Sequence, residues 1–320
     1  MRLSEVGFGA STLGNPGRAV TDDDAQRAVE HAWHRGIRYF DTAPHYGLGL
    51  SERRLGRALL GRPREEYVVS TKVGRLLEPH PQPTPLDDDG FLVPGNLRRV
   101  WDTTPDGVRR SLDESLGRLG LDYVDIAYAH DPDQYRPEAG LDALEALADV
   151  RSQGVVRAIG VGTNQPDQVP GLFADGLADV VMVAGRYTLL EQGGLASALD
   201  PGSARGVSIV VAGVFNSGLL SRPWPTDDAR YDYGQASAGI VARARRLAAV
   251  CEQHGTTLPA AAIAFPLLQS SVAGIVLGMH TIEQIDANLD RYAAGVPPEL
   301  WDDLRESGLV DPAALPEPHA

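Results

Sequence analysis

The sequence has very little lysine and almost no cysteine. Among 29 Lys and Arg residues only Lys72 is a lysine, and 43 Asp and Glu residues bring the net charge of the 320-residue chain to −14. Nucleic-acid binding draws on a basic surface, so a chain this acidic, with no basic stripe, is poorly suited to it. The single cysteine, Cys251, excludes an intrachain disulfide and fits a reducing compartment.

Long apolar runs and clustered metal ligands are also missing. No stretch approaches the roughly 20 apolar residues of a membrane-spanning helix, and the first residues lack the apolar centre of a signal peptide. The eight histidines are scattered, without the spacing of a metal site. A hydrophobic content of 43% still allows a large core. We therefore expect a soluble cytoplasmic protein without a metal, membrane or nucleic-acid partner.

Short runs rich in Val and Ile recur eight times, and stretches with helical periodicity lie between most of them. Strands that are apolar on both faces and alternate with helices predict a parallel eight-stranded (β/α)₈ TIM barrel, here one domain over residues 1–320. A doubly wound open sheet is the alternative, but neither a G-x-G-x-x-G nor a P-loop pattern follows any strand. The predicted strands are 6–9, 37–40, 67–70, 123–128, 156–161, 180–183, 207–211 and 272–277, with helices at 23–35, 105–119 and 138–153.

Two predicted connections are long, and both follow strands, so both would lie on the C-terminal face of a barrel, where active sites are built. Residues 214–235 are rich in aromatic side chains and are expected to form a lid. Residues 76–103 are rich in proline and fit a lid or a disordered segment equally well. The last residues, 311–320, contain three prolines and are expected to form a flexible tail.

Four polar side chains are predicted to meet at one rim of this barrel. Asp41, Lys72 and His130 stand at the ends of three consecutive predicted strands, and Tyr46 follows Asp41 in the same loop. Taken singly, each is more simply explained as a cap, a packed aromatic or a loop histidine, but the ends of consecutive strands are neighbours. Their convergence favours a catalytic site.

This set has a chemical interpretation. A phenol titrates near pH ~10, too high for efficient proton exchange at neutrality, and an adjacent ammonium lowers that value. We predict that Tyr46 is the acid/base, that Lys72 lowers its pKa, and that Asp41 holds Lys72. His130 would then donate a hydrogen bond to the reacting oxygen.

Several motifs surround this predicted site. They are residues 36–47 (GIRYFDTAPHYG), Ser51-Glu52, Gly56, Ser70-Thr71-Lys72, residues 117–125 (GRLGLDYVD) and Ala129-His130-Asp131-Pro132. Together they resemble the signature of the aldo-keto reductases, over essentially the whole chain. The resemblance implies a (β/α)₈ barrel that binds NAD or NADP without a Rossmann domain, with Tyr46, Lys72, His130 and Asp41 as its catalytic tetrad.

The resemblance also implies cofactor contacts. Thr163 and Asn164 would hold the nicotinamide carboxamide, and Phe215 would replace a stacking ring, since Ala212 and Gly213 occupy the place of the family's aromatic-Ser pair. Ala184 stands where the family usually has Gln, three residues before an aromatic. The implied cofactor-binding set is Thr163, Asn164, Tyr187, Phe215, Gly218, Leu219, Gly278, His280, Gln284 and Asn288.

His280 takes the place where the family often has an arginine that grips the 2′-phosphate of NADP. An arginine pairs bidentately with phosphate, whereas a neutral imidazole does not. We therefore predict a relaxed choice between NAD and NADP, or a preference for NAD.

Within the family, residues 185–192 and 214–219 are most similar to the L-fucose and D-threo-aldose 1-dehydrogenase branch. This implies oxidation of the anomeric hydroxyl of an aldose to a lactone, with Tyr46 as base. The alternative is a reductase of an aldehyde or ketone, such as pyridoxal or a secondary metabolite, with Tyr46 as acid. A nucleotide-sensing binding subunit is a third possibility, disfavoured by the intact tetrad. Loop residues such as Trp224 and Tyr231 would shape the substrate pocket.

Overall fold

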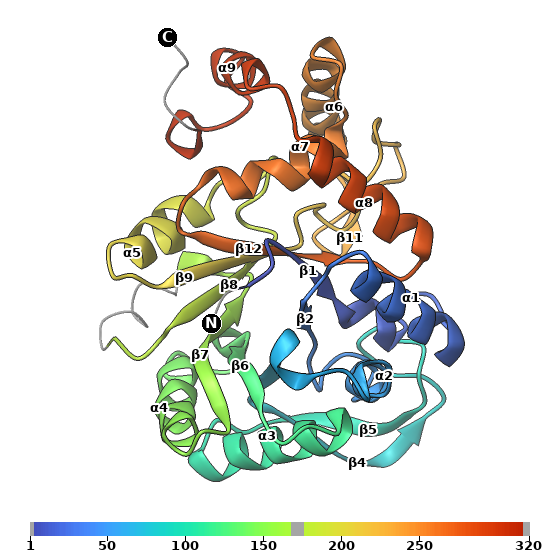
Figure 1. Ribbon diagram of the computed structural model, residues 1–320, viewed down its shortest axis with the longest axis vertical. Coiled ribbons are helices and arrows are strands. Elements are labelled where there is room, and N and C mark those ends of the chain that lie inside the picture. The colour runs from blue at the N-terminus through green and yellow to red at the C-terminus, as the bar shows by residue number, and fades with distance from the viewer. Residues whose placement is uncertain (1–2, 168–175, 316–320) are drawn as a thin grey trace.

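The computed structural model describes residues 3–167 and 176–315. Eight parallel strands close a barrel in the order β1-β12-β9-β8-β7-β6-β3-β2, with the helices outside it (Figure 1). The predicted (β/α)₈ barrel is confirmed, and each predicted run overlaps one barrel strand. These strands are β1 (Val6–Gly9), β2 (Tyr39–Asp41), β3 (Val68–Val73), β6 (Val124–His130), β7 (Val156–Thr163), β8 (Val180–Ala184), β9 (Ser208–Ala212) and β12 (Val272–Gly278).

Five of the described helices begin where a short hydroxyl side chain accepts a hydrogen bond from a free backbone N–H of the first turn. Thr21, Thr104 and Thr281 do so for α1, α3 and α8, and Gly120 ends α3 with a φ of 67°. The helix predicted to start at Asp23 therefore begins one residue earlier, at Asp22. The helices are α1 (Asp22–His34), α2 (Leu50–Leu59), α3 (Pro105–Leu119), α4 (Ala139–Ser152), α5 (Asp200–Ser203), α6 (Ala238–Gln253), α7 (Leu258–Ala264), α8 (Ile282–Ala294) and α9 (Glu299–Glu306).

The core has two layers, as alternating side chains on parallel strands require. Side chains two residues apart on one strand, such as Ile126 and Tyr128 or Val180 and Met182, share a cluster inside the barrel. The intervening residues join a much larger cluster between the strands and the surrounding helices. The polar side chains of the site therefore lie at one end of a filled barrel.

The proline-rich connection is ordered, so the expected disordered segment is wrong, and its role as a lid stays a prediction. Its residues make an antiparallel hairpin of β4 (Arg75–Thr84) and β5 (Gly95–Trp101), packed beside α3. Prolines at alternate positions of β4 lack N–H groups along one edge of the strand only. A strand in a two-stranded hairpin has one unpaired edge, where no N–H donor is needed. Leu77, Phe91 and Val93 from this region form an apolar cluster with Leu48, against which Tyr46 packs.

The aromatic connection carries a short hairpin of β10 (Arg230–Tyr231) and β11 (Gly234–Gln235), tied to the end of β8 by an ion pair of Arg186 with Asp232 at 3.0 Å. The predicted flexible tail is wrong for residues 311–315: Pro312–Ala314 form a 3₁₀ turn, and Ala314 and Leu315 are buried in the core. Residues 316–320 lie outside the described residues. No helix in the described ranges is long and apolar enough to cross a membrane.

Candidate active site

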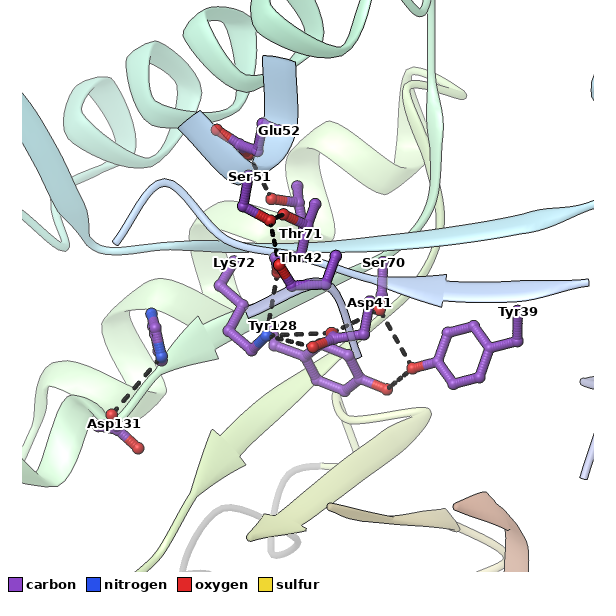
Figure 2. A network of polar contacts seen from close by, with 12 residues as sticks. Tyr39, Asp41, Thr42, Ser51, Glu52, Ser70, Thr71, Lys72, Tyr128 and Asp131 are labelled. Atoms are coloured by element: carbon purple, nitrogen blue, oxygen red, sulfur yellow. Dashed lines mark hydrogen bonds and ion pairs between the residues drawn. The ribbon is translucent and has the colours of Figure 1, made fainter. Parts of the chain in front are cut away.

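Lys72 and Asp41 form a buried ion pair at the C-terminal mouth of the barrel (Figure 2). The Lys72 side chain is 3% exposed, and its Nζ donates to Asp41 Oδ2 at 2.8 Å, to Oδ1 at 3.0 Å and to the carbonyl oxygen of Thr42 at 3.0 Å. Burial lowers the pKa of Lys72, but its interactions with Asp41 and Tyr46 together more than offset this, and the pKa lies above its usual value. The ammonium therefore stays charged.

Strand register explains why these two residues meet. β2 and β3 are parallel neighbours in which Asp41 stands opposite Ser70, so Lys72, two residues on, points to the same side. Ser70 Oγ donates to Asp41 Oδ1 at 2.7 Å, and the Tyr39 hydroxyl lies 3.1 Å from Ser70 Oγ. The carboxylate is thus held by two side chains of β3, Ser70 and Lys72, and Ser70 in turn contacts Tyr39 of β2.

Tyr46 lies beside this pair, on the loop between β2 and α2. The Lys72 Nζ is 4.8 Å from the centre of the Tyr46 ring, which also contacts Phe91. Gly47 fixes the loop: its φ is 63°, and a Cβ there would lie 2.4 Å from the carbonyl oxygen of Gly14. Only glycine permits that approach, which clamps the Tyr46 loop against the turn after β1.

The expected net fall in the pKa of Tyr46 is wrong for this structure. Burial raises the pKa of the phenol to about 12, although Lys72 lowers it as predicted. Desolvation is the larger effect because the phenolate would be removed from water among apolar side chains. The structure therefore holds Tyr46 as a protonated phenol at neutral pH.

His130, at the end of β6, completes the group. Its ring centre lies 5.9 Å from that of Tyr46 and 5.4 Å from that of His45. Burial, helped by the nearby charges of Arg75 and Lys72, holds the pKa of His130 well below its usual value. A neutral imidazole with one N–H suits hydrogen-bond donation to an uncharged oxygen. The four predicted side chains thus share one small volume.

Sequence reasoning missed three residues at the same mouth: His45, Arg75 and Asp131. Arg75 Nη2 donates to Asp131 Oδ2 at 2.8 Å, and Arg75 Nη1 lies 3.4 Å from His45 Nδ1. His45 and Asp131 are next in sequence to the predicted residues Tyr46 and His130, and this adjacency was the signal that could have found them. Nothing in the sequence alone showed that β4 would begin beside the site.

Residues 5–308 match the sequence profile of the Aldo/keto reductase family. The chain belongs to this family. It is 46% identical to D-threo-aldose 1-dehydrogenase of Pseudomonas sp. over 97% of this chain and 95% of that one, and 37% identical to pyridoxal 4-dehydrogenase of Microbacterium luteolum with the same coverage. Among solved structures, an aldo-keto reductase of Bacillus halodurans in its holo form matches with a TM-score of 0.76 and 25% identity, over 99% of this chain and 95% of that one.

This aldo-keto reductase is therefore an oxidoreductase, of a family that uses nicotinamide cofactors. Two hollows lie at the C-terminal ends of the strands. One of about 210 Å³ is lined by Asn164 at the end of β7, by Gly185 and Gly213, and by residues of the β10–β11 hairpin. The other, of about 240 Å³, lies between Arg18 and the start of α8. No group of three or more His, Cys, Asp or Glu that could hold a metal ion occurs within residues 3–167 and 176–315.

The predicted cofactor residues at the start of α8 lie together. Gly278 is exposed at the end of β12, the Gln284 side chain accepts a hydrogen bond from the His280 N–H at 3.1 Å, and Asn288 is buried on the next turn. At the end of β7, Thr163 Oγ1 donates to Asp133 Oδ1 at 2.7 Å, so this hydroxyl already has an acceptor.

Two predicted cofactor contacts, those of the Tyr187 and Leu219 side chains, are not supported by their positions. Tyr187 is fully buried, its ring 5.2 Å from that of Phe265, because it fills the layer between the barrel and the outer helices and so offers no face for stacking. The Leu219 side chain is in the core. The N–H groups of Gly218 and Leu219 donate within their own turn, at 3.0 and 3.2 Å. Phe215 is only partly buried where it packs against the core, so its contact with the cofactor stays a prediction.

Proposed function

We propose that this aldo-keto reductase oxidises the anomeric hydroxyl of an aldose to a lactone, with transfer of hydride to NAD or NADP. The observation that carries the proposal is the buried Lys72–Asp41 pair set against Tyr46, with a neutral His130 beside them. The 46% identity to D-threo-aldose 1-dehydrogenase supports an aldose as substrate.

The chain's own residues would perform the proton transfer. His130 donates a hydrogen bond to the anomeric oxygen, and Tyr46 accepts that oxygen's proton as C1 loses its hydride. Lys72 stabilises the phenolate that accepts the proton, and Asp41 keeps the ammonium charged and in place. The bound nicotinamide supplies the hydride acceptor.

The cofactor would lie along the rim from β7 to α8. Asn164 would hold the carboxamide end, and Gly278, His280, Gln284 and Asn288 the adenosine end. The two hollows described above support this placement.

A screen of free aldoses with NAD and with NADP tests the proposal. L-fucose and the D-threo aldoses should produce reduced nicotinamide and a lactone, measured by absorbance and by product analysis. No turnover of any aldose, with turnover of simple aldehydes in the reductive direction, would replace this proposal with the second candidate.

That second candidate is a reductase of aldehydes or ketones, including pyridoxal or a secondary metabolite. A specific observation favours it: burial raises the pKa of Tyr46 to about 12, so the phenol is protonated and ready to act as an acid. The two candidates differ in direction and substrate, and they share the same four residues.

The raised pKa of Tyr46 predicts opposite pH profiles for the two directions. Oxidation needs the phenolate, whose fraction grows about tenfold per pH unit below the pKa, so log kcat/KM should rise with a slope of about one from pH 7 to 10. Reduction needs the phenol, which persists over that range, and should stay nearly flat. Initial rates in matched buffers measure both, and a plateau in oxidation near pH 7 would contradict this reading.

The surroundings of His280 predict a relaxed cofactor choice. Arg18 Nη1 lies 3.5 Å from His280 Nε2, so a cation stands near the imidazole that replaces the family's arginine. We expect dissociation constants for NAD and NADP within about tenfold of each other. Arg18→Ala should weaken NADP binding and spare NAD, as measured by fluorescence titration.

Arg110→Ala is the matched control, because Arg110 is also an arginine but pairs with Glu114 on α3 and does not line this hollow. It should leave both constants unchanged. A large preference of the wild-type protein for NADP would contradict the prediction from His280.

A further inference from the structure

Arg75 and Asp131 lie beside the tetrad and have no part in the proton transfer described above. Asp131 follows His130 at the end of β6, and Arg75 begins β4 three residues after Lys72. β3 and β6 are neighbours in the barrel, so this pair shares the rim sector of Lys72 and His130. Asp131 Oδ2 accepts a hydrogen bond from Arg75 and also lies 3.6 Å from His130 Nε2.

Folding alone gives little reason for this pair. The Arg75 and Asp131 side chains are only 11% and 19% exposed. The desolvation of a pair this buried often exceeds its Coulombic gain, so an apolar pair would serve stability equally well. Burial raises the pKa of Asp131 to about 6 while Arg75 lowers it, and the carboxylate is therefore ionised above neutrality.

The pair still has unused hydrogen-bonding capacity. The Arg75 guanidinium is held over the Trp101 ring at 4.4 Å and reaches Gln134 Oε1 at 3.1 Å, but its buried Nε has no partner among the described residues. Asp131 Oδ1 accepts no hydrogen bond from the part of the chain that the structure describes. A carboxylate oxygen and a guanidinium N–H side by side match a hydroxyl group, which donates and accepts at once.

We propose that Arg75 and Asp131 form a binding subsite for the hydroxyl on the carbon next to the reacting carbon. When the reacting oxygen accepts from His130 Nε2, the next oxygen of a vicinal pair comes within reach of the Asp131 carboxylate 3.6 Å away. Asp131 accepts the hydroxyl proton, and Arg75 donates to the hydroxyl oxygen. The sugar assignment rests on the function proposed above, in which this group is the C2 hydroxyl of an aldose.

The test compares substrates that differ only in this hydroxyl. Lactaldehyde (2-hydroxypropanal) and propanal form one pair, assayed by reduction, and L-fucose and 2-deoxy-L-fucose form the other, assayed by oxidation. The wild-type protein should prefer the hydroxylated member of each pair. Asp131→Asn should lower kcat/KM for the hydroxylated members by roughly tenfold to a hundredfold, mainly through KM, and leave propanal nearly unchanged.

Asp142→Asn is the matched control, because Asp142, on α4, also pairs with an arginine, Arg136. It should keep the wild-type preference. Arg75→Gln is the second variant, in case Asp131→Asn fails to fold, and it should also lose the preference for the hydroxylated substrates.

The outcomes separate the subsite from the proposed function. Loss of the lactaldehyde preference in the variants, without any oxidation of L-fucose by the wild-type protein, keeps the subsite and removes the aldose assignment. An equal fall for lactaldehyde and propanal would make the pair structural and overturn the inference. A preference that survives in the variants, or that the wild-type protein lacks, overturns it as well.

Discussion

Tyr46→Phe should reduce kcat by about 10²–10⁴-fold while leaving dinucleotide binding almost unchanged. The substitution removes only the hydroxyl that exchanges the proton. The ring remains, and with it the packing against Phe91 and His130 that fixes the loop. Stopped-flow or steady-state turnover measures the loss, and fluorescence titration with NAD and NADP measures the binding.

Tyr67→Phe is the matched control for this prediction. Tyr67 is also a buried tyrosine, but its ring packs against Trp33 and Phe40 in the cluster between the strands and the outer helices. Its loss of a hydroxyl should not change kcat. Wild-type turnover by Tyr46→Phe would remove Tyr46 from the acid/base role and with it the proposed mechanism.

The barrel was predictable because its causes are local and repeated. Each strand is a short β-branched run that is apolar on both faces, and each predicted helix carries its own start and stop residues. Strand order then follows from the parallel alternation, and it brings Asp41, Lys72 and His130 to one rim. The same reasoning placed Tyr46 only through its closeness to Asp41 in sequence, while its clamp by Gly14 and Gly47 is a contact between distant segments.

The remaining features depend on tertiary context that no local pattern carries. Prolines at alternate positions are typical of irregular segments, yet β4 accepts them because it pairs on one side only. Tyr187 is an aromatic residue and could in principle stack on a cofactor, but its ring packs against Phe265 instead. Burial raises the pKa of Tyr46 and the Lys72 ammonium lowers it, so the result depends on how deeply the ring is buried. The β4–β5 region, whose structure the sequence did not predict, contributes to that burial.

Lys72→Arg should abolish most turnover, although the charge is conserved. The Nζ is enclosed by the Asp41 carboxylate and the Thr42 carbonyl, all within 3.0 Å, in a side chain that is 3% exposed. A guanidinium is planar and larger, so it cannot take this place without moving Asp41 or Tyr46. We expect a fall in kcat of about 10²–10⁴-fold, comparable to the loss of the acid/base itself.

Removing the charge separates stability from catalysis. Lys72→Met leaves the buried Asp41 carboxylate without its cation and should lower the free energy of unfolding by about 3–5 kcal/mol. Adding Asp41→Asn removes the unpaired charge, so the double variant should regain part of that stability and remain inactive. Urea unfolding and turnover measured on the same samples check both statements. A double variant less stable than Lys72→Met, or either variant with wild-type turnover, would show that the ion pair does not have the role assigned to it.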